Sequence, residues 1–300
     1  MGTVLALLCV LAVVAALWLR TQTDEAPLRL ILGLLALVAA VAAGSRIASL
    51  VRGGALRPRA AGAMGTVAII GVAALGCWIG ANSPELTWFG HQVSHGARTR
   101  DEVAITFDDG PNISATLAIA AALDAHHAKG TFFEVGKAVN RRPDITRALI
   151  ADGHLIGNHS YHHDSTHWLD PRYLELEKAQ HAIEQQAGVC PAFFRAPHGQ
   201  HTPAMAHVVH DAGMVMVGWD VSAGDWLAKD PQKLAKRILS KVRPGSIIDL
   251  HDGLDGNVTV DRTVLARAMP YILDGLEARH LTPVRLDVLL GRRGYLAGCA

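Results

Sequence analysis

Residues Val103–Pro111, with the sequence VAITFDDGP, join a short apolar run to two adjacent acids and a turn signal. The β-branched and aromatic content of Val103–Phe107 predicts a buried strand. Asp108 and Asp109 follow it, and Gly110-Pro111 is a turn signal. Because successive side chains of an extended chain point apart, one acid can bind a metal ion while the other stays free as a base. A solvated turn is the simpler interpretation of these residues taken alone.

Outward from this strand, short apolar runs alternate with longer helical stretches. Such alternation predicts an α/β fold, a parallel sheet or barrel with helices outside. Seven predicted strands are one fewer than in the usual eight-stranded barrel. The other six strands are predicted at Thr131–Val135, Leu155–Asn158, Ala192–Arg195, Met214–Trp219, Ser246–Leu250 and Pro283–Leu286. The helices are predicted at Ala115–Ala128, Pro143–Ala151, Pro171–Gln186, Thr202–Ala212, Pro231–Val242 and Val264–Ala278.

Polar residues stand where these strands end. His159 follows the third strand, Arg195 ends the fourth, Asp220 follows the fifth and His251 follows the sixth. In a β/α barrel the loops at the carboxyl ends of the strands converge on one active site. We therefore expect residues far apart in the sequence to meet there.

The segment His159–His163, HSYHH, places two histidines four residues apart. His159 and His163 would share one face if the segment were helical, a spacing used by paired imidazole ligands. Two histidines and a carboxylate leave a position for water on a catalytic metal ion, which can lower the pKa of that water toward ~7. His162 is expected to be a bystander. A solvated histidine patch is the alternative.

Three more residues could complete a catalytic set. Arg195 is a permanent cation whose planar fork can orient a carboxylate. His251 could protonate a leaving amine, as histidines with a pKa near neutrality do. Asp225-Trp226 precedes it in the chain. Each signal is weak alone, but together, with most of them placed after predicted strands, they favour one catalytic site.

With these motifs, the chain resembles the polysaccharide deacetylases of carbohydrate esterase family four, the NodB-homology group, over roughly Val103–Leu290. The Asp-Asp-Gly-Pro box and the H-S-x-x-H box carry the resemblance, and Gly153–Asn158 leading into His159 is also typical. The resemblance implies a distorted (β/α)7 barrel, a divalent metal and hydrolysis of N-acetyl groups on amino sugars.

The resemblance also implies a role for each matching residue. Asp108 would be the general base, braced by Arg195. His251 would be the general acid, oriented by Asp225. Zinc or a similar divalent ion would be held by Asp109, His159 and His163. The substrate pocket would involve Pro197, His198, Trp226, Asp249 and Leu250, with a backbone N–H near His198 helping to hold the oxyanion.

Two positions depart from the family pattern. His198 stands where tyrosine is frequent, and there the role is largely that of the backbone. In the last box, usually Leu-x-His, Asp249-Leu250-His251 places an acid where the pocket leucine belongs. An acid facing an acetyl methyl group would be poorly solvated. Either Asp249 is turned away, or the pocket accepts a different acyl group or a more polar substrate.

The N-terminal third has a different composition. Val4–Leu19, Leu30–Ala43 and Gly62–Ala81 predict about three transmembrane helices, since a span needs about 20 apolar residues. A cleaved signal peptide is the alternative for the first run, but a Lys/Arg-rich start and an A-x-A-like site are missing. We predict a membrane anchor over residues 1–82, a linker over 83–99 and a NodB-homology catalytic domain over 100–300.

Charge and cysteines suggest a location. The four arginines between the second and third runs (Arg46, Arg52, Arg57 and Arg59) predict a cytoplasmic loop and therefore an extracytoplasmic catalytic domain on the cell membrane. A net charge of +1 gives no reason to expect nucleic acid as a partner. Cys190 and Cys299 could pair in an oxidising compartment, but we favour two isolated thiols.

Three functions remain open. The leading one is removal of N-acetyl groups from an extracytoplasmic glycan, such as peptidoglycan or another N-acetylhexosamine polymer. The second is deacetylation or deformylation of a lipid-linked amino sugar close to the membrane. The third is a non-catalytic glycan-binding protein, because fold does not fix function.

Overall fold

The computed structural model describes residues 50, 53–54, 58–164 and 166–299. The chain divides into two compact units, Met1–Ile79 and Gly80–Ala300. Of the three predicted spans, Val4–Leu19 and Leu30–Ala43 lie outside the described residues. The third, Gly62–Ala81, lies within helix α3, Pro58–Ala81, so the structure has a helix there but does not support the predicted membrane span. None of the helices in the described residues is long and apolar enough to cross a membrane.

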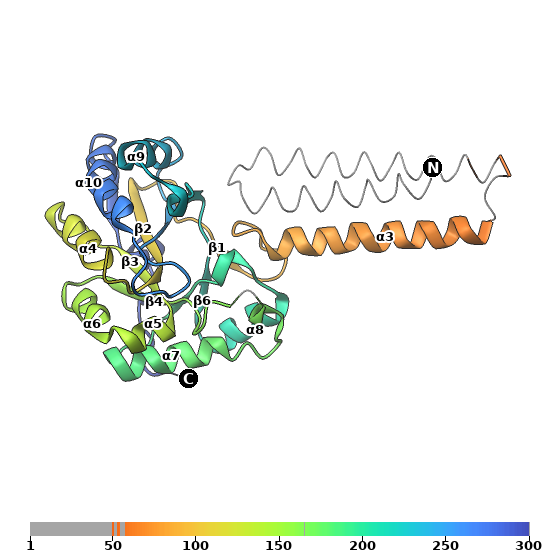
Figure 1. Ribbon diagram of the computed structural model, residues 1–300, viewed down its shortest axis with the longest axis horizontal. Coiled ribbons are helices and arrows are strands. Elements are labelled where there is room, and N and C mark those ends of the chain that lie inside the picture. The colour runs from red at the N-terminus through yellow and green to blue at the C-terminus, as the bar shows by residue number, and fades with distance from the viewer. Residues whose placement is uncertain (1–49, 51–52, 55–57, 165, 300) are drawn as a thin grey trace. The chain divides into compact units, whose positions relative to one another are not determined.

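The second unit is built on a curled parallel sheet (Figure 1). Its order is β1-β6-β5-β4-β3-β2-β8-β7, with β9 pairing with β2. All seven predicted strands are present, and the parallel sheet agrees with a distorted (β/α)7 barrel. Within the described residues two further strands, β1 and β7, lie at the ends of the sheet. The strands are β1 Gln92–Val93, β2 Glu102–Gly110, β3 Thr131–Glu134, β4 Leu155–Asn158, β5 Phe193–Phe194, β6 Val215–Val217, β7 Val221–Ser222, β8 Ile247–His251 and β9 Thr282–Val284.

Helices cover the outside of this sheet (Figure 1). Six were predicted, and their positions are confirmed with small shifts at the ends: α4 Thr116–Ala125, α6 Pro143–Ala151, α7 Glu175–Ala187, α8 Pro203–Asp211, α9 Pro231–Leu239 and α10 Thr263–Glu277. Helix α5, Gly136–Arg141, was not predicted, and α11, Leu286–Leu290, begins at the last residue of the strand predicted over Pro283–Leu286. Three short 3-10 helices follow strands: η1 His167–Leu169, η2 Pro197–Gly199 and η3 Asp225–Leu227.

Strand β2 shows how the sequence separates the core from the site. Successive side chains of a strand point to opposite faces. Phe107 packs into the larger apolar core with residues of α4, α9 and α10, whereas Ala104 joins a smaller cluster on the other face. Thr106 lies on that second face and donates a hydrogen bond to the Ile248 carbonyl at 2.7 Å. The side of the sheet that carries Asp108 is therefore the polar interior of the barrel.

The segment predicted as a linker is partly built into the sheet. Ser83 and Gln92 are buried, and Gln92–Val93 pairs with β6 as strand β1. The Ala81 carbonyl accepts a hydrogen bond from the His201 backbone N–H at 2.8 Å, and the Asn82 side chain accepts one from Gln200 at 3.0 Å. The chain therefore enters the second unit beside the loop that contains η2.

The two C-terminal cysteines form a disulfide, which corrects our preference for isolated thiols. Cys190 and Cys299 are 109 residues apart in the sequence, but their Cα atoms lie 5.2 Å apart. Tyr295 forms a bridge with Pro191, and this contact brings the tail to the start of β5. Spacing alone could not reveal this neighbourhood. Cys77 in the first unit is free and exposed.

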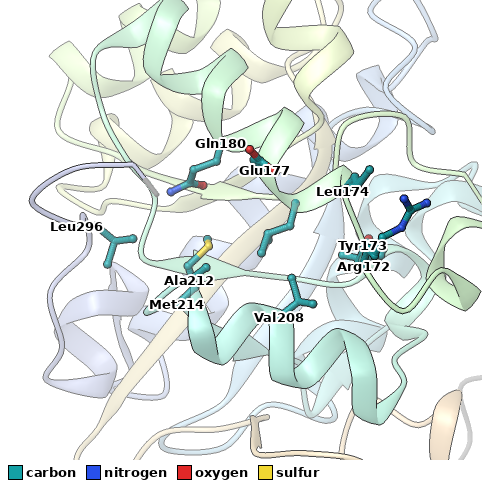
Figure 2. A pocket seen from close by; sticks show the side chains of 10 residues that line it. Arg172, Tyr173, Leu174, Glu177, Gln180, Val208, Ala212, Met214 and Leu296 are labelled. Atoms are coloured by element: carbon teal, nitrogen blue, oxygen red, sulfur yellow. The ribbon is translucent and has the colours of Figure 1, made fainter.

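A surface cavity of about 330 Å³ lies between α7 and α8 (Figure 2). Tyr173, Leu176, Val208, Met214 and Leu296 supply most of its apolar lining. None of the predicted site residues lines it. The functional site must therefore be sought at the polar ends of the strands.

Candidate active site

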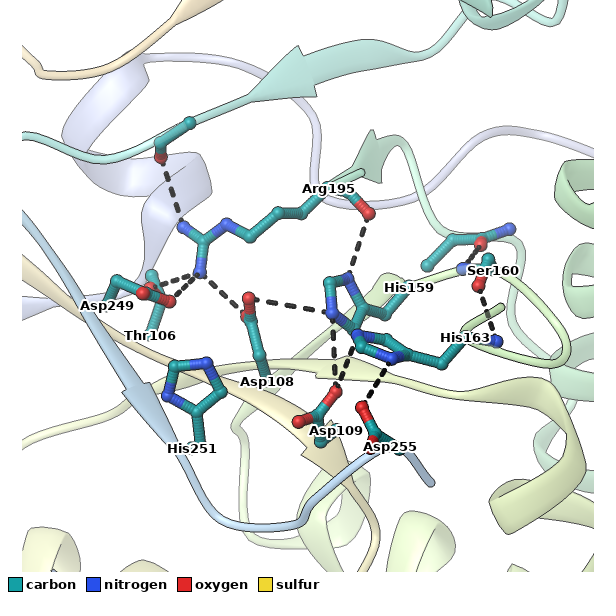
Figure 3. Close-up of polar contacts among 12 residues, drawn as sticks. Thr106, Asp108, Asp109, His159, Ser160, His163, Arg195, Asp249, His251 and Asp255 are labelled. Carbon is teal, nitrogen blue, oxygen red and sulfur yellow. Dashed lines mark hydrogen bonds and ion pairs between the residues drawn. The ribbon is translucent and has the colours of Figure 1, made fainter. Parts of the chain in front are cut away.

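The three predicted metal ligands meet at one point (Figure 3). Asp109 is the penultimate residue of β2, and His159 directly follows β4. The Asp109 Oδ1 atom lies 3.0 Å from His163 Nε2 and 3.5 Å from His159 Nε2. All three side chains are buried. Two imidazoles and one carboxylate are a donor set that suits a catalytic divalent ion, with a coordination position left for water.

The loop that contains His159 and His163 is not helical, although we paired these two residues on the condition that it would be. Ser160 and His163 have left-handed backbone angles, φ 66° and 55°. The Asn158 side chain accepts a hydrogen bond from Ser160 N at 2.9 Å, and Ser160 Oγ accepts one from His163 N at 3.1 Å. Such side-chain contacts replace helical hydrogen bonds. His159 and His163 still lie side by side, because the tight loop brings His163 back to His159.

His162 is directed away from the three donors, as expected for a bystander. Its backbone N–H donates to Glu175 Oε2 at 2.8 Å, and its ring Nδ1 lies 3.0 Å from the same oxygen. Glu175 is the first residue of α7 and is almost fully buried. It therefore anchors the histidine loop to that helix.

The donor atoms fit a cation. Asp109 Oδ1 is buried without a hydrogen-bond partner. Burial alone would raise the pKa of Asp109, but His163 and His159 outweigh it and hold that pKa well below its usual value. His159 donates from Nδ1 to the Arg195 carbonyl at 2.9 Å, which leaves its Nε2 lone pair free to bind a metal. The residues present thus match the divalent metal that the family resemblance implies.

The predicted base and its brace are in contact. Arg195 Nη1 donates to Asp108 Oδ1 at 2.7 Å and to Thr106 Oγ1 at 2.7 Å. Arg195 is fully buried, and its guanidinium stacks 4.2 Å from the centre of the Phe133 ring. Asp108 Oδ2 lies 3.7 Å from His159 Nε2, so this carboxylate borders the metal ligands without being one of them. The arrangement fits a base held beside a metal.

Asp249 is turned into the barrel, toward Arg195 and close to Asp108 and His251. Its Oδ1 atom lies 3.3 Å from Arg195 Nη1, and the residue is 1% exposed. Burial, reinforced by Asp108, raises the pKa of Asp249 well above its usual value, despite the opposing effects of His251 and Arg195. Leu250 points to the other face of β8 and packs in the larger apolar core. Leu250 is thus placed away from the predicted pocket.

The candidate acid is held by a carboxylate. His251 Nδ1 lies 3.0 Å from Asp225 Oδ1, and the His251 backbone N–H donates to Asp225 Oδ2 at 3.0 Å. Arg262 forms an ion pair with that second oxygen and donates to the His251 carbonyl at 2.9 Å. Burial opposes the charge on His251, but Asp225 and Asp249 raise its pKa well above the usual value. These carboxylates therefore favour the protonated form of His251.

The three remaining pocket residues also lie at this edge of the sheet. The Trp226 ring meets His251 edge-on at 4.9 Å between centroids and is 39% exposed. His198, in η2 with φ 57°, meets the His163 ring edge-on at 4.6 Å. Pro197 precedes it and is buried. The predicted pocket residues apart from Leu250 are therefore brought to the site.

Sequence reasoning missed two charged residues of the site. Arg262 braces Asp225, and Asp255 places its Oδ1 atom 2.9 Å from His163 Nδ1. Asp255-Gly256 is a turn dipeptide shortly after His251, which is a weak signal. Arg262 lies eleven residues beyond His251, and no local pattern marks it.

Taken together, a carboxylate base, a protonated histidine and three metal donors face one another at the carboxyl ends of parallel strands. A site of this composition can activate water, stabilise a developing oxyanion and protonate a leaving group. Fold and site thus define a hydrolase-like site of the parallel α/β class with a candidate metal-binding group.

Comparison with known proteins identifies the family. The Polysaccharide deacetylase profile matches residues 95–217. A chitooligosaccharide deacetylase of Azorhizobium caulinodans is 34% identical over 197 residues, covering 63% of this chain and 94% of the relative. A peptidoglycan-N-acetylglucosamine deacetylase of Bacillus cereus is 29% identical over 179 residues, covering 59% and 65%. The crystal structure of the Bc1960 peptidoglycan N-acetylglucosamine deacetylase has a TM-score of 0.63 at 26% identity, covering 68% and 94%. The chain belongs to the polysaccharide deacetylase family, and it is an enzyme of that class.

The first prediction concerns the pairing of His251 with Asp225. Because the pKa of His251 is raised, its acid form is present at neutral pH and is lost as the pH rises through that pKa. Asp225→Asn removes the negative charge that raises the pKa of His251, so the basic limb of the kcat/KM profile should move to lower pH. The maximal rate should fall by roughly 10²-fold as the acid loses its orientation. A pH–rate profile measures both effects.

Asp230→Asn is the matched control. Asp230 caps α9 by accepting from Gln232 N at 2.9 Å, and an asparagine side chain can do the same. Its profile should coincide with that of the wild type. An Asp225→Asn profile with an unmoved basic limb would show that His251 is not the acid.

Proposed function

We propose that this enzyme is a metal-dependent hydrolase that removes N-acetyl groups from amino sugars of an extracytoplasmic glycan, peptidoglycan or another N-acetylhexosamine polymer. The observation that carries the proposal is the convergence of Asp108, Arg195 and His251 on three metal donors in one buried site. The names of the relatives, which act on chitooligosaccharides and on peptidoglycan, agree with it.

The chain's own residues account for the proton transfers. Asp108 accepts a proton from the attacking water while Arg195 fixes the orientation of its carboxylate. The water oxygen bonds to the amide carbon, the C–N bond breaks, and His251 donates its proton to the leaving nitrogen. Acetate and a free amino sugar result. Asp225 holds His251 through Nδ1, which keeps Nε2 available for the donation.

Asp109, His159 and His163 would hold the divalent ion, and we propose zinc, which favours a tetrahedral site of nitrogen and oxygen donors. When bound, the ion supplies Lewis acidity to the water and to the amide carbonyl. The other residues bind, orient and move protons around it.

The second prediction separates the base from the ligands. Asp109→Ala should lose the metal and the activity together, because one of three protein ligands is gone. Asp108→Asn should keep the metal but lose at least roughly 10²-fold in turnover, because the base is gone. Metal content per protein and acetate release from N-acetylglucosamine oligomers are the two measurements. Full activity in Asp108→Asn would refute the assignment of the base.

His162→Ala is the matched control, since His162 lies in the same loop but is directed to Glu175. It should keep a full equivalent of metal. A pure, metal-loaded enzyme that releases no acetate from any N-acetylhexosamine oligomer would count against the proposed polymer substrate.

We also propose that the catalytic unit works outside the cytoplasm, on the cell membrane. The disulfide between Cys190 and Cys299 supports this location, since disulfides persist in oxidising compartments. The apolar runs Val4–Leu19 and Leu30–Ala43 in the sequence, together with the arginines between residues 46 and 59, are typical of a membrane-attached protein with its arginines inside.

The third prediction tests this location by thiol labelling. Spheroplasts are reduced mildly and exposed to a membrane-impermeant maleimide before or after lysis. Cys190 and Cys299 should be labelled before lysis. A double variant, Cys190→Ser with Cys299→Ser, removes that signal and controls for Cys9 and Cys77. Labelling of the pair only after lysis would place the unit inside.

One observation favours the lipid-linked amino sugar as a second candidate substrate. Residues Gly80–Pro84 are packed beside the η2 loop, at the edge of the sheet that carries the site. Large exposed apolar side chains stand on loops at that same edge: Ile113, Trp226, Leu227 and Leu254. Exposed apolar groups of this kind mark contacts with membranes or other apolar surfaces. A site bordered by such apolar side chains would meet lipid-linked sugars readily.

The fourth prediction uses Leu227, which is 64% exposed and is not one of the residues assigned a catalytic role. Leu227→Asp should lower deacetylation of a polyprenyl-linked amino sugar in liposomes several-fold, and leave turnover of soluble oligomers unchanged. Val288→Asp, an exposed position in α11, is the control. Equal rates for Leu227→Asp and the control on liposomes would argue against a lipid-surface substrate.

A non-catalytic glycan-binding role receives no support from the site. Loss of a ligand or of the base would be its signature, and Asp108, Asp109, His159, His163, Arg195, Asp225 and His251 all converge.

A further inference from the structure

Each of the two metal-ligand histidines has its Nδ1 atom beside an oxygen, and the two oxygens differ. His159 Nδ1 donates to a neutral acceptor, the Arg195 carbonyl, at 2.9 Å. His163 Nδ1 lies 2.9 Å from a charged one, Asp255 Oδ1 (Figure 3). Among the described residues this nitrogen of His163 forms no hydrogen bond of good geometry, so the contact with Asp255 is an ion-pair contact at close distance. The pairing with a carboxylate is thus particular to His163.

The backbone around Asp255 is built to deliver its carboxylate. Asp255 and Gly256 have φ values of 48° and 65°, and Asn257 N donates to the Leu254 carbonyl at 2.8 Å. This pair of left-handed residues forms a tight turn in which glycine is favoured at the second position. A Cβ on Gly256 would lie only 2.7 Å from Val135 Cγ1. The turn is therefore packed directly against the loop that follows β3.

A second contact fixes the same loop from the other side. The Asn112 side chain donates to the Asn257 carbonyl at 3.1 Å and to the Val260 carbonyl at 3.0 Å. Asn112 follows the Asp108-Asp109 pair in the chain. These hydrogen bonds therefore hold the loop that carries Asp255 close to the end of the strand that carries Asp109.

From this geometry we propose that Asp255 is a positioning residue for the metal: it fixes the orientation and tautomer of His163, so that Nε2 faces the ion with its lone pair. A carboxylate that accepts from the distal N–H of a ligand imidazole also raises the basicity of the ligating nitrogen. The inference rests on the metal site of the proposed function and deepens it. It makes His163 the stronger of the two imidazole donors.

The fifth prediction follows for metal affinity. Asp255→Ala should weaken zinc binding by about 10–100-fold, the usual effect of removing such a partner. Asp255→Asn keeps an acceptor oxygen of the same shape without the charge, so its loss should be smaller. The dissociation constant is measured by competition with a chromophoric chelator on the full chain, together with the number of zinc equivalents bound. At saturating zinc, the alanine variant should recover most of the wild-type kcat.

Asp261→Asn is the matched control, because it makes the same charge change in the same loop. Asp261 accepts from Thr263 N at 2.9 Å, which asparagine can also do. Its zinc dissociation constant should equal that of the wild type. Thermal unfolding of the metal-free variants shows whether any loss comes from misfolding, and the near-isosteric Asp255→Asn keeps the test open if the alanine variant is unstable.

The outcomes are distinguishable. A wild-type dissociation constant in Asp255→Ala would overturn the inference and leave the proposed function intact. Wild-type protein that binds no zinc at all would overturn the proposed function itself. Two zinc equivalents in the wild type and one in Asp255→Ala would make Asp255 a ligand of a second ion, with His163 and His198 beside it, and would also overturn the positioning role.

Discussion

The buried guanidinium of Arg195 is the contact on which the rest of the site depends. Its Nη1 atom donates to Asp108 on β2, its Nη2 atom donates to the Gly218 carbonyl beyond β6 at 3.2 Å, and its own carbonyl accepts a hydrogen bond from His159 Nδ1. Arg195 thus positions the predicted base Asp108 and the predicted metal ligand His159, and its contacts link the ends of β2, β5 and β6. Removing one partner of such a buried pair leaves an uncompensated charge at a cost of about 3–5 kcal/mol. The base and the metal ligand are therefore coupled through the fold.

The register of the parallel sheet explains how a few residues are enough to build the site. Asp108 is in register with Phe133 on β3 and with His251 on β8, so the base and the acid lie on neighbouring strands at the same height. His159 directly follows β4 and accordingly arrives at the same edge. The loops then need to supply only orientation: Asp225 for the acid and the Ser160 turn for the second imidazole. Catalytic geometry is in this way largely a property of strand register.

The sequence predicted the parts of this protein that depend on local pattern. Apolar runs identified seven strands and six helices, and the Asp-Asp and histidine motifs identified the residues that meet as candidate metal donors. β1 and β7 have two residues each and lie in segments without an apolar run, unlike the equally short β5. The helical spacing assumed for His159 and His163 was wrong, because the side chains of Asn158 and Ser160 capture backbone N–H groups. The disulfide and the contact of Asp255 depend on tertiary proximity, which no local pattern reports.

Asp249 illustrates how a departure from the family pattern can be absorbed. Two carboxyl groups, those of Asp108 and Asp249, approach one nitrogen of Arg195 at 2.7 and 3.3 Å. If both were ionised, one guanidinium would serve two anions in a buried site, and the like charges would repel. Burial and the neighbouring Asp108 raise the pKa of Asp249, which lessens this conflict by favouring the neutral carboxyl group. The charge of Arg195 then remains committed to Asp108, so an acid at this position is compatible with a single functional base.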